Sequence, residues 1–130
     1  MKYQSADFTD DLRRTIESIE TKAEEHVGLL VAKYRPLFSE RNLEFDAGFD
    51  REGMDPFTPP YRSSLSIGMF GEEEELIHTA WIWQCDREWM GISVSRAIPG
   101  SKITGLLFVQ TFEEIQQELK ETVEEFLSGL

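Results

Sequence analysis

The sequence predicts an α+β domain with two layers, in which two terminal helices cover one face of an antiparallel sheet of four to five strands. Three patterns indicate this fold: helical apolar spacing near the N-terminus, alternating apolar and polar residues through the middle, and helical spacing again in the last twenty residues. The predicted order is α-β-β-β-β-β-α, and consecutive strands with short connections pair antiparallel. The 130 residues have the length of a single domain.

The first helix is predicted from about residue 8 to residue 34. Thr9 or Ser5 can cap its start, and Pro36 is expected to end it, because a residue before proline avoids the helical region. Such a helix is long for a small domain, so part of its apolar stripe would overhang the sheet and need a partner. We therefore expect a homodimer. The stripe consists of Phe8, Leu12, Ile16, Ile19, Ala23, Val27, Leu30 and Tyr34.

The middle of the chain is predicted to form strands. Alternation of apolar and polar residues begins at Leu43, whereas three prolines and a glycine make 50–60 a loop. A helix over 72–84 is the alternative for one segment, but its Ile, Thr and Trp residues favour a strand. The predicted strands are 43–49, 61–70, 76–85, 89–98 and 103–109, with a hairpin turn at Asp86-Arg87 and another turn at Pro99-Gly100.

The last helix is predicted to begin after Thr111, which can form a capping box with Glu114. Gly129 suits its C-terminal cap. Its buried stripe is predicted to be Phe112, Ile115, Leu119, Val123 and Phe126.

All three tryptophans lie within the stretch HTAWIWQCDREW, residues 78–89. If the hairpin loop at Asp86-Arg87 has an even number of residues, Trp81 and Trp83 share a face with Met90, Ile92 and Val94 and pack in the core. An odd loop would place both tryptophans outside. We favour the even loop, which matches apolar residues with apolar residues. Cys85 then lies near a turn and is interpreted as an ordinary free thiol.

The outer face of the sheet is predicted to carry mostly small polar residues. It is either a solvated face or a docking face for a partner, with Trp89 as the anchor. A second hypothesis is that the protein is a binding protein or an enzyme for a small anionic ligand, which the cations and hydroxyls of this face or the groove beside the 50–60 loop would hold. The candidate residues for ligand or partner binding are Arg62, Ser64, Ser66, His78, Trp89, Ser93 and Arg96. Gly68, Gly91, Ser95 and Gln84 are expected on the same face.

The charge of the chain is strongly negative, with 25 acidic and 13 basic residues and a formal net charge of -12. Such a chain repels nucleic acids and anionic lipids, so we expect neither nucleic-acid nor membrane binding. A basic protein partner fits better. The C-terminal helix offers an acidic surface for one, although a solvated face is the alternative; its residues are Glu114, Glu118, Glu121 and Glu125. A single cysteine and the absence of a signal peptide predict a cytoplasmic location.

No motif in the sequence names a chemistry. Glu75-Leu-Ile-His78 has the spacing of a carboxylate di-iron site, but a second copy is missing, so we expect no metal and no cofactor. His26 flanks the apolar stripe of the first helix and is interpreted as a boundary residue of that helix rather than as a base. The chain is similar to small acidic secretion chaperones and to toxin-immunity proteins in size, charge and element order. These observations favour a non-catalytic interaction protein (chaperone-, inhibitor- or immunity-like) over an enzyme.

Overall fold

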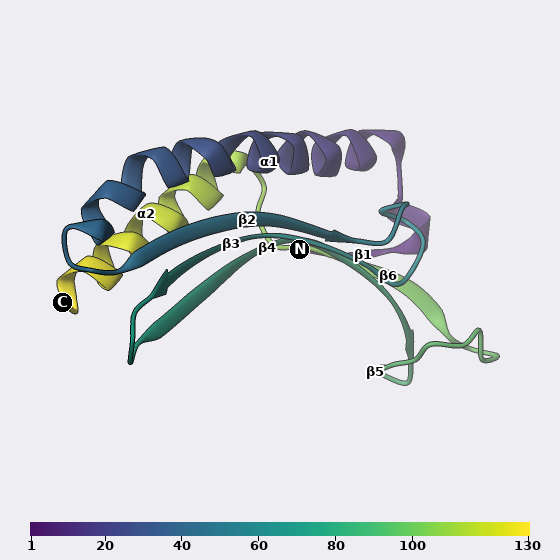
Figure 1. Ribbon diagram of the computed structural model, residues 1–130. Coiled ribbons are helices and arrows are strands. Elements are labelled where there is room, and N and C mark those ends of the chain that lie inside the picture. Colours follow the sequence, from purple (N-terminus) through teal and green to yellow (C-terminus); the bar gives the residue numbers. More distant parts are fainter.

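The computed structural model describes residues 1–130 and consists of one antiparallel sheet with two helices on the same face (Figure 1). The α+β architecture predicted from the sequence is confirmed. In chain order the elements are β1 (Lys2–Gln4), a short 3-10 turn (Ser5–Asp7), α1 (Asp10–Ser39), β2 (Glu44–Glu52), β3 (Tyr61–Phe70), β4 (Glu75–Trp89), β5 (Ile92–Ser93), β6 (Lys102–Leu107) and α2 (Phe112–Ser128).

Neither helix is both long enough and apolar enough to cross a bilayer.

Helix α1 begins as predicted and ends later. Thr9 is its N-cap, and the Thr9 hydroxyl accepts a hydrogen bond of 3.2 Å from the Leu12 N–H. The prediction that Pro36 ends the helix is wrong, because the helix continues to Ser39. Its last turn is held by packing: Phe38 is fully buried and stacks on Phe45 with 5.3 Å between ring centroids. Proline in a final turn removes a single N–H donor, and this contact offsets that loss.

The apolar stripe of α1 is covered along its length. Six of its eight predicted members are buried, and Phe8 and Val27 are partly buried against the core. No part of this stripe overhangs the sheet, so the reason for which we predicted a homodimer is absent.

Helix α2 also follows its prediction, with Phe112, Ile115, Leu119 and Val123 buried and Gly129 at its C-cap. The capping box differs in detail: Glu114 accepts from the Gln110 N–H, and the Thr111 side chain makes no cap bond.

The strand order in the sheet is β1-β6-β4-β3-β2, with β5 paired to the end of β4. The 15-residue β4 joins two halves of the sheet, because its first part pairs with β3 and its second part with β6. The strand interpretation of 72–84 is therefore confirmed from Glu75 onward. Strand β1, which pairs with β6, was not predicted, since three residues carry no readable alternation.

The predicted hairpin at Asp86-Arg87 and the predicted strand 89–98 are wrong. Strand β4 runs straight through Asp86-Arg87, and the chain turns at Met90-Gly91, between the paired residues Trp89 and Ile92. Both turn residues have positive φ, 51° and 80°, as a tight two-residue hairpin loop requires. Only Ile92–Ser93 then pairs with β4, and residues 94–101 form a loop.

A β-bulge in β4 separates the two tryptophans that were predicted to share a face. Ser64 pairs with Trp81 but Ser63 pairs with Trp83, so Ile82 is an extra residue in β4. An extra residue shifts the alternation of side chains by one position. The prediction is right for Trp83, which is fully buried beneath the helices, and wrong for Trp81, which lies on the opposite face and is 37 % exposed.

The Trp83 indole is the centre of an aromatic cluster at the N-terminal end of α1. Its ring contacts those of Tyr3, Phe8 and Phe57 at centroid distances of 6.0, 5.8 and 6.2 Å. Gly105 of β6 lies directly against the ring, and a Cβ there would come within 2.0 Å of a ring carbon. Glycine at this position is thus required for the tryptophan to pack.

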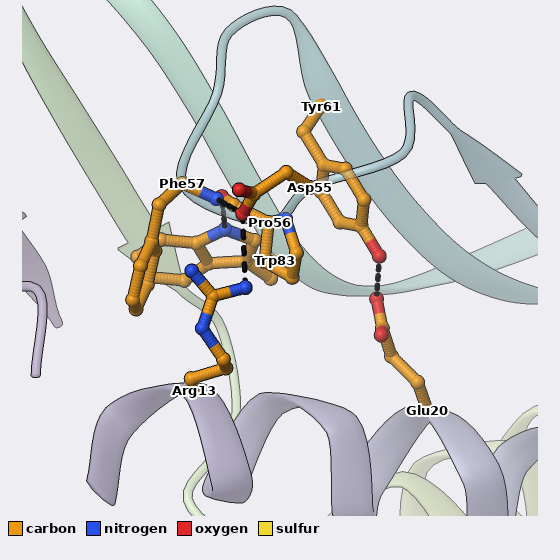
Figure 2. Close-up of polar contacts among 7 residues, drawn as sticks. All are labelled: Arg13, Glu20, Asp55, Pro56, Phe57, Tyr61 and Trp83. Carbon is orange, nitrogen blue, oxygen red and sulfur yellow. Dashed lines mark hydrogen bonds and ion pairs between the residues drawn. The ribbon is translucent and has the colours of Figure 1, made fainter. Parts of the chain in front are cut away.

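Residues 53–60 form a loop that is fixed to this cluster (Figure 2). The Trp83 Nε1–H donates to the Pro56 carbonyl at 2.6 Å, and Arg13 forms a 2.9 Å ion pair with Asp55. The hydrogen bond from the Phe57 N–H, together with Arg13, lowers the pKa of the Asp55 carboxyl. At the end of the loop, the Tyr61 hydroxyl donates to the buried carboxylate of Glu20 at 2.6 Å. The loop is therefore rigidly attached to α1 and β4.

Ser63 offers a test of the packing on the helix-covered face. Its hydroxyl is buried and has no hydrogen-bond partner. We expect Ser63→Ala to raise the free energy of unfolding by about 1 kcal/mol, because an unsatisfied buried hydroxyl is removed. Ser66→Ala is the matched control on the other face. It removes a 3.1 Å hydrogen bond to Thr79 and should lower the free energy. Urea denaturation measures both, and a loss of stability for Ser63→Ala would contradict the assignment.

Candidate functional site

One face of the sheet carries no helix. Figure 1 shows that the sheet arches beneath α1 and α2 and that its ends bend away from the helices, so the uncovered face is concave. We call it the free face. Phe45, Ala47 and Phe49 of β2 pack toward the helices, so the alternating residues of that strand lie on the free face. The register of the sheet then assigns the residues of the other strands to one face or the other. The free face includes Glu44, Asp46, Gly48, Asp50, Glu52, Arg62, Ser64, Ser66, Gly68, Ile77, Thr79, Trp81, Gln84 and Leu106.

Exposed apolar side chains gather on one part of the free face. We call Ile77, Trp81, Leu106 and Phe108 the apolar strip; their exposed fractions are 59, 37, 37 and 42 %. The rings of Trp81 and Phe108 lie 6.5 Å apart. Phe108, just after β6, is held by a 3.0 Å hydrogen bond from its N–H to the Ile82 carbonyl. The bulge in β4 therefore places a tryptophan on the surface next to a second aromatic ring.

Carboxylates line the far side of the same face. Edge strand β2 presents Glu44, Asp46, Asp50 and Glu52 there, and we call these four residues the acidic edge. Only Asp46 has a cationic partner, since its carboxylate lies 3.6 Å from Arg35 and also accepts from the Ala47 N–H. The other three form no ion pair. An edge strand with such charges resists pairing with another sheet, and it also presents unneutralised negative charge.

Small residues separate the acidic edge from the apolar strip. Gly48, Ser66 and Gly68 form the floor of a shallow hollow of about 220 Å³ between Asp46 and Ile77. At Gly68 a Cβ would lie 2.7 Å from the Phe70 ring, so only glycine leaves that ring in place. The free face is thus a trough with an acidic side, an apolar side and, between Arg62 and Phe70 on β3, a floor of small residues.

The structure brings together only part of the predicted binding site. Arg62, Ser64 and Ser66 lie on the free face as predicted. His78 does not: it lies on the helix-covered face, where its Nε2 is 3.0 Å from the Glu118 carboxylate of α2. The bulge explains why the predicted face of His78 is wrong, because the alternation of side chains between the two faces changes phase at Ile82. The predicted cluster of Arg62, His78 and Arg96 is therefore not assembled.

The remaining predicted residues lie away from the trough. Trp89 and Ser93 are at the β4–β5 hairpin, and Arg96 is in the loop that follows.

The acidic surface of α2 exists, but most of it is engaged within the chain. The carboxylates of Glu114, Glu118 and Glu121 interact with the Gln110 N–H, with His78 and with the Gln117 amide. Glu125 is the predicted member whose carboxylate has no such contact.

His26 packs edge-on against Phe112 of α2, with 5.3 Å between the ring centroids, and burial and Lys33 lower the pKa of His26. His26 is half-buried at this contact, which agrees with its interpretation as a residue at the boundary of the apolar stripe.

Cys85 lies within β4 and is fully buried, and the turn that was predicted beside it is at Met90-Gly91 instead. Burial, together with Asp86 and Asp55, raises the pKa of its thiol to about 12. We expect no reaction with a thiol reagent at pH 8 in the native state, and labelling in urea that follows the unfolded fraction. Because the folded pKa lies above the ordinary value of about 8.5, the stabilising contribution is complete below that value and lost as the pH rises toward 12. Rapid labelling without urea would contradict this burial.

The apolar strip and the acidic edge were not identified from the sequence. The sequence does indicate the acidic edge, because residues 44, 46, 50 and 52 are all even-numbered positions of one strand and therefore share a face.

No group of three His, Cys, Asp or Glu side chains is placed to hold a metal ion. No protein-family model matches the chain, and comparison with curated proteins and with solved structures finds no significant similarity.

Proposed function

We propose that the protein is a non-catalytic interaction module that binds a basic protein partner in the trough of the free face. The observation that supports this is the separation of an apolar strip from an acidic edge by a floor of small residues. A partner segment with apolar side chains on one side and Lys or Arg on the other matches both walls. Such a segment fits the trough in shape and in charge.

The two walls contribute in different ways. Burial of Trp81 and Phe108 supplies affinity, because large aromatic side chains at the centre of an interface dominate binding energy. The three unpaired carboxylates of the acidic edge supply specificity and a faster encounter. A net charge of -12 attracts a basic partner from a distance.

Other surfaces and other occupants fit less well. Helix α2 is acidic, but none of its side chains is a large, exposed apolar group, and three of its four candidate carboxylates already have partners. A second copy of the chain would bring a second acidic edge, which opposes self-association through this face. A basic partner therefore fits the trough best.

Two matched charge reversals test the proposal. Asp50→Lys with Glu52→Lys changes the acidic edge, and Glu121→Lys with Glu125→Lys changes net charge equally on α2. A partner captured from the native host is identified, purified and titrated by calorimetry at two salt concentrations. We expect the first pair to raise Kd by at least about tenfold and to reduce the salt dependence. The second pair should change Kd by less than about twofold.

Three results would overturn the proposal. One is a partner that is not basic, and another is an equal loss of affinity for both pairs. The third is sedimentation that shows a dimer of this chain which Trp81→Ala dissociates, because a second copy would then occupy the free face.

A further inference from the structure

A second and larger hollow lies at the end of the sheet, in a gap between strands. Strand β3 pairs with β4 only as far as Cys85, and β5 pairs with it only from Glu88. Asp86 and Arg87 between them have β6 on one side and no strand on the other. A cavity of about 690 Å³ fills this gap, bounded by the 53–60 loop and by residues 93–97. We call it the end cavity.

The end cavity concentrates positive charge in an acidic protein. Arg62 and Asp86 line it from the free face and Arg87 from the opposite face, and Asp86 is the only carboxylate. The Arg62 guanidinium lies 3.7 Å from the Asp86 carboxylate, which is too far for a hydrogen bond. Arg87 has no carboxylate partner and donates one hydrogen bond, of 3.1 Å, to the Ser101 hydroxyl. A guanidinium has five N–H donors, so most donors of both arginines remain unused.

The walls of the end cavity are held in place by other parts of the fold. One wall is the 53–60 loop, which Trp83 and Arg13 attach to β4 and α1 (Figure 2). The opposite wall is tied to β4 by the hydrogen bond from the Val94 N–H to the Arg87 carbonyl, at 2.8 Å. Pro59, Val94 and Ile103 give the walls apolar surface. Small-molecule sites combine such apolar walls with a few convergent polar groups.

We propose that the end cavity binds a small oxyanion attached to a compact apolar group, such as an aromatic carboxylate or phosphate ester. Arg62 on the free face and Arg87 on the opposite face of the sheet would donate from two sides to an oxyanion held in the gap between them, because guanidinium groups match carboxylate and phosphate oxygens. Pro59, Val94 and Ile103 contact the apolar part. Asp86 holds Arg62 at the cavity and leaves a single excess positive charge, which limits the site to small anions. This inference does not depend on the proposed partner.

Phenyl phosphate and benzoate are the probes, and benzyl alcohol is the neutral control. Amide chemical shifts in NMR titrations report binding to the intact chain. We expect saturable binding of at least one anion, with shifts confined to residues 57–62, 86–87 and 93–97. Arg62→Gln and Arg87→Gln should each raise Kd by about tenfold or more. Arg14→Gln is the matched control, because Arg14 lies on α1 and pairs only with Asp11.

The inference is overturned if neither anion saturates below about 10 mM, a concentration that corresponds to negligible affinity. It is also overturned if benzyl alcohol binds as well as the anions, or if the Arg62 and Arg87 variants bind like Arg14→Gln. Urea denaturation of each variant verifies that the fold is retained before titration.

Discussion

Trp83→Ala is expected to lower the free energy of unfolding by about 3–5 kcal/mol, the range for truncation of a buried aromatic side chain. The Trp83 side chain is fully buried and contacts three other aromatic rings. Its Nε1–H also satisfies the Pro56 carbonyl. A loss of this size is a large part of the stability of a typical domain.

The cavity left by Trp83→Ala cannot collapse easily. Phe57 is fixed between the Phe8 ring, stacked at 4.6 Å, and the Arg13 guanidinium, 4.5 Å from its centroid. The surrounding groups are therefore held in place, and an unfilled cavity adds to the cost of the lost burial. The 53–60 loop would also lose its hydrogen bond to the indole.

Urea denaturation measures this change, and Trp81→Ala is the control. It removes the same side chain from the same strand, but from a surface position, so we expect a loss below about 1 kcal/mol. Equal losses at the two positions would mean that β4 has no bulge between them and that both tryptophans belong to the core.

Elements that depend on local periodicity could be predicted from the sequence. The stripes of α1 and α2 and the strand at 61–70 follow from the spacing of apolar residues alone. Features that depend on distant contacts could not. Phe38 continues α1 past Pro36 because Phe45 stacks on it, and the second half of β4 pairs with β6 rather than with the residues that follow it.

The candidate site shows the same division. Glu44 and Asp46 of the acidic edge lie in the predicted strand 43–49, and the positions of Ser64 and Ser66 were predicted correctly. Asp50 and Glu52 lie in the segment that was predicted as a loop, because β2 continues to Glu52. The position of Trp81 depends on one extra residue in β4, Ile82. An isoleucine is compatible with a bulge and with a regular strand, so its residue type does not reveal the bulge. The bulge has a large consequence, because it moves His78 and Trp81 each to the face of the sheet opposite to the one predicted. A bulge is decided by packing across the sheet, which a single sequence does not display.

The apolar strip should carry most of the affinity for the proposed partner. We expect Trp81→Ala to raise Kd by about 30-fold or more, since truncation of a central aromatic anchor costs at least about 2 kcal/mol and 1.4 kcal/mol corresponds to tenfold. Phe108→Ala should have a smaller effect in the same direction, because its ring supports that of Trp81 from one side. Calorimetric titration with the purified partner measures both.

Trp89→Ala is the decisive control for this prediction. Trp89 is on the same strand and is 37 % exposed, as Trp81 is, but it lies at the β4–β5 hairpin and outside the trough. The two substitutions remove equal apolar surface from the exterior, so a general effect of hydrophobicity would weaken binding equally. A loss of affinity confined to Trp81→Ala locates the contact on the free face. A loss confined to Trp89→Ala would place the partner at the hairpin, and the trough would then have no part in binding.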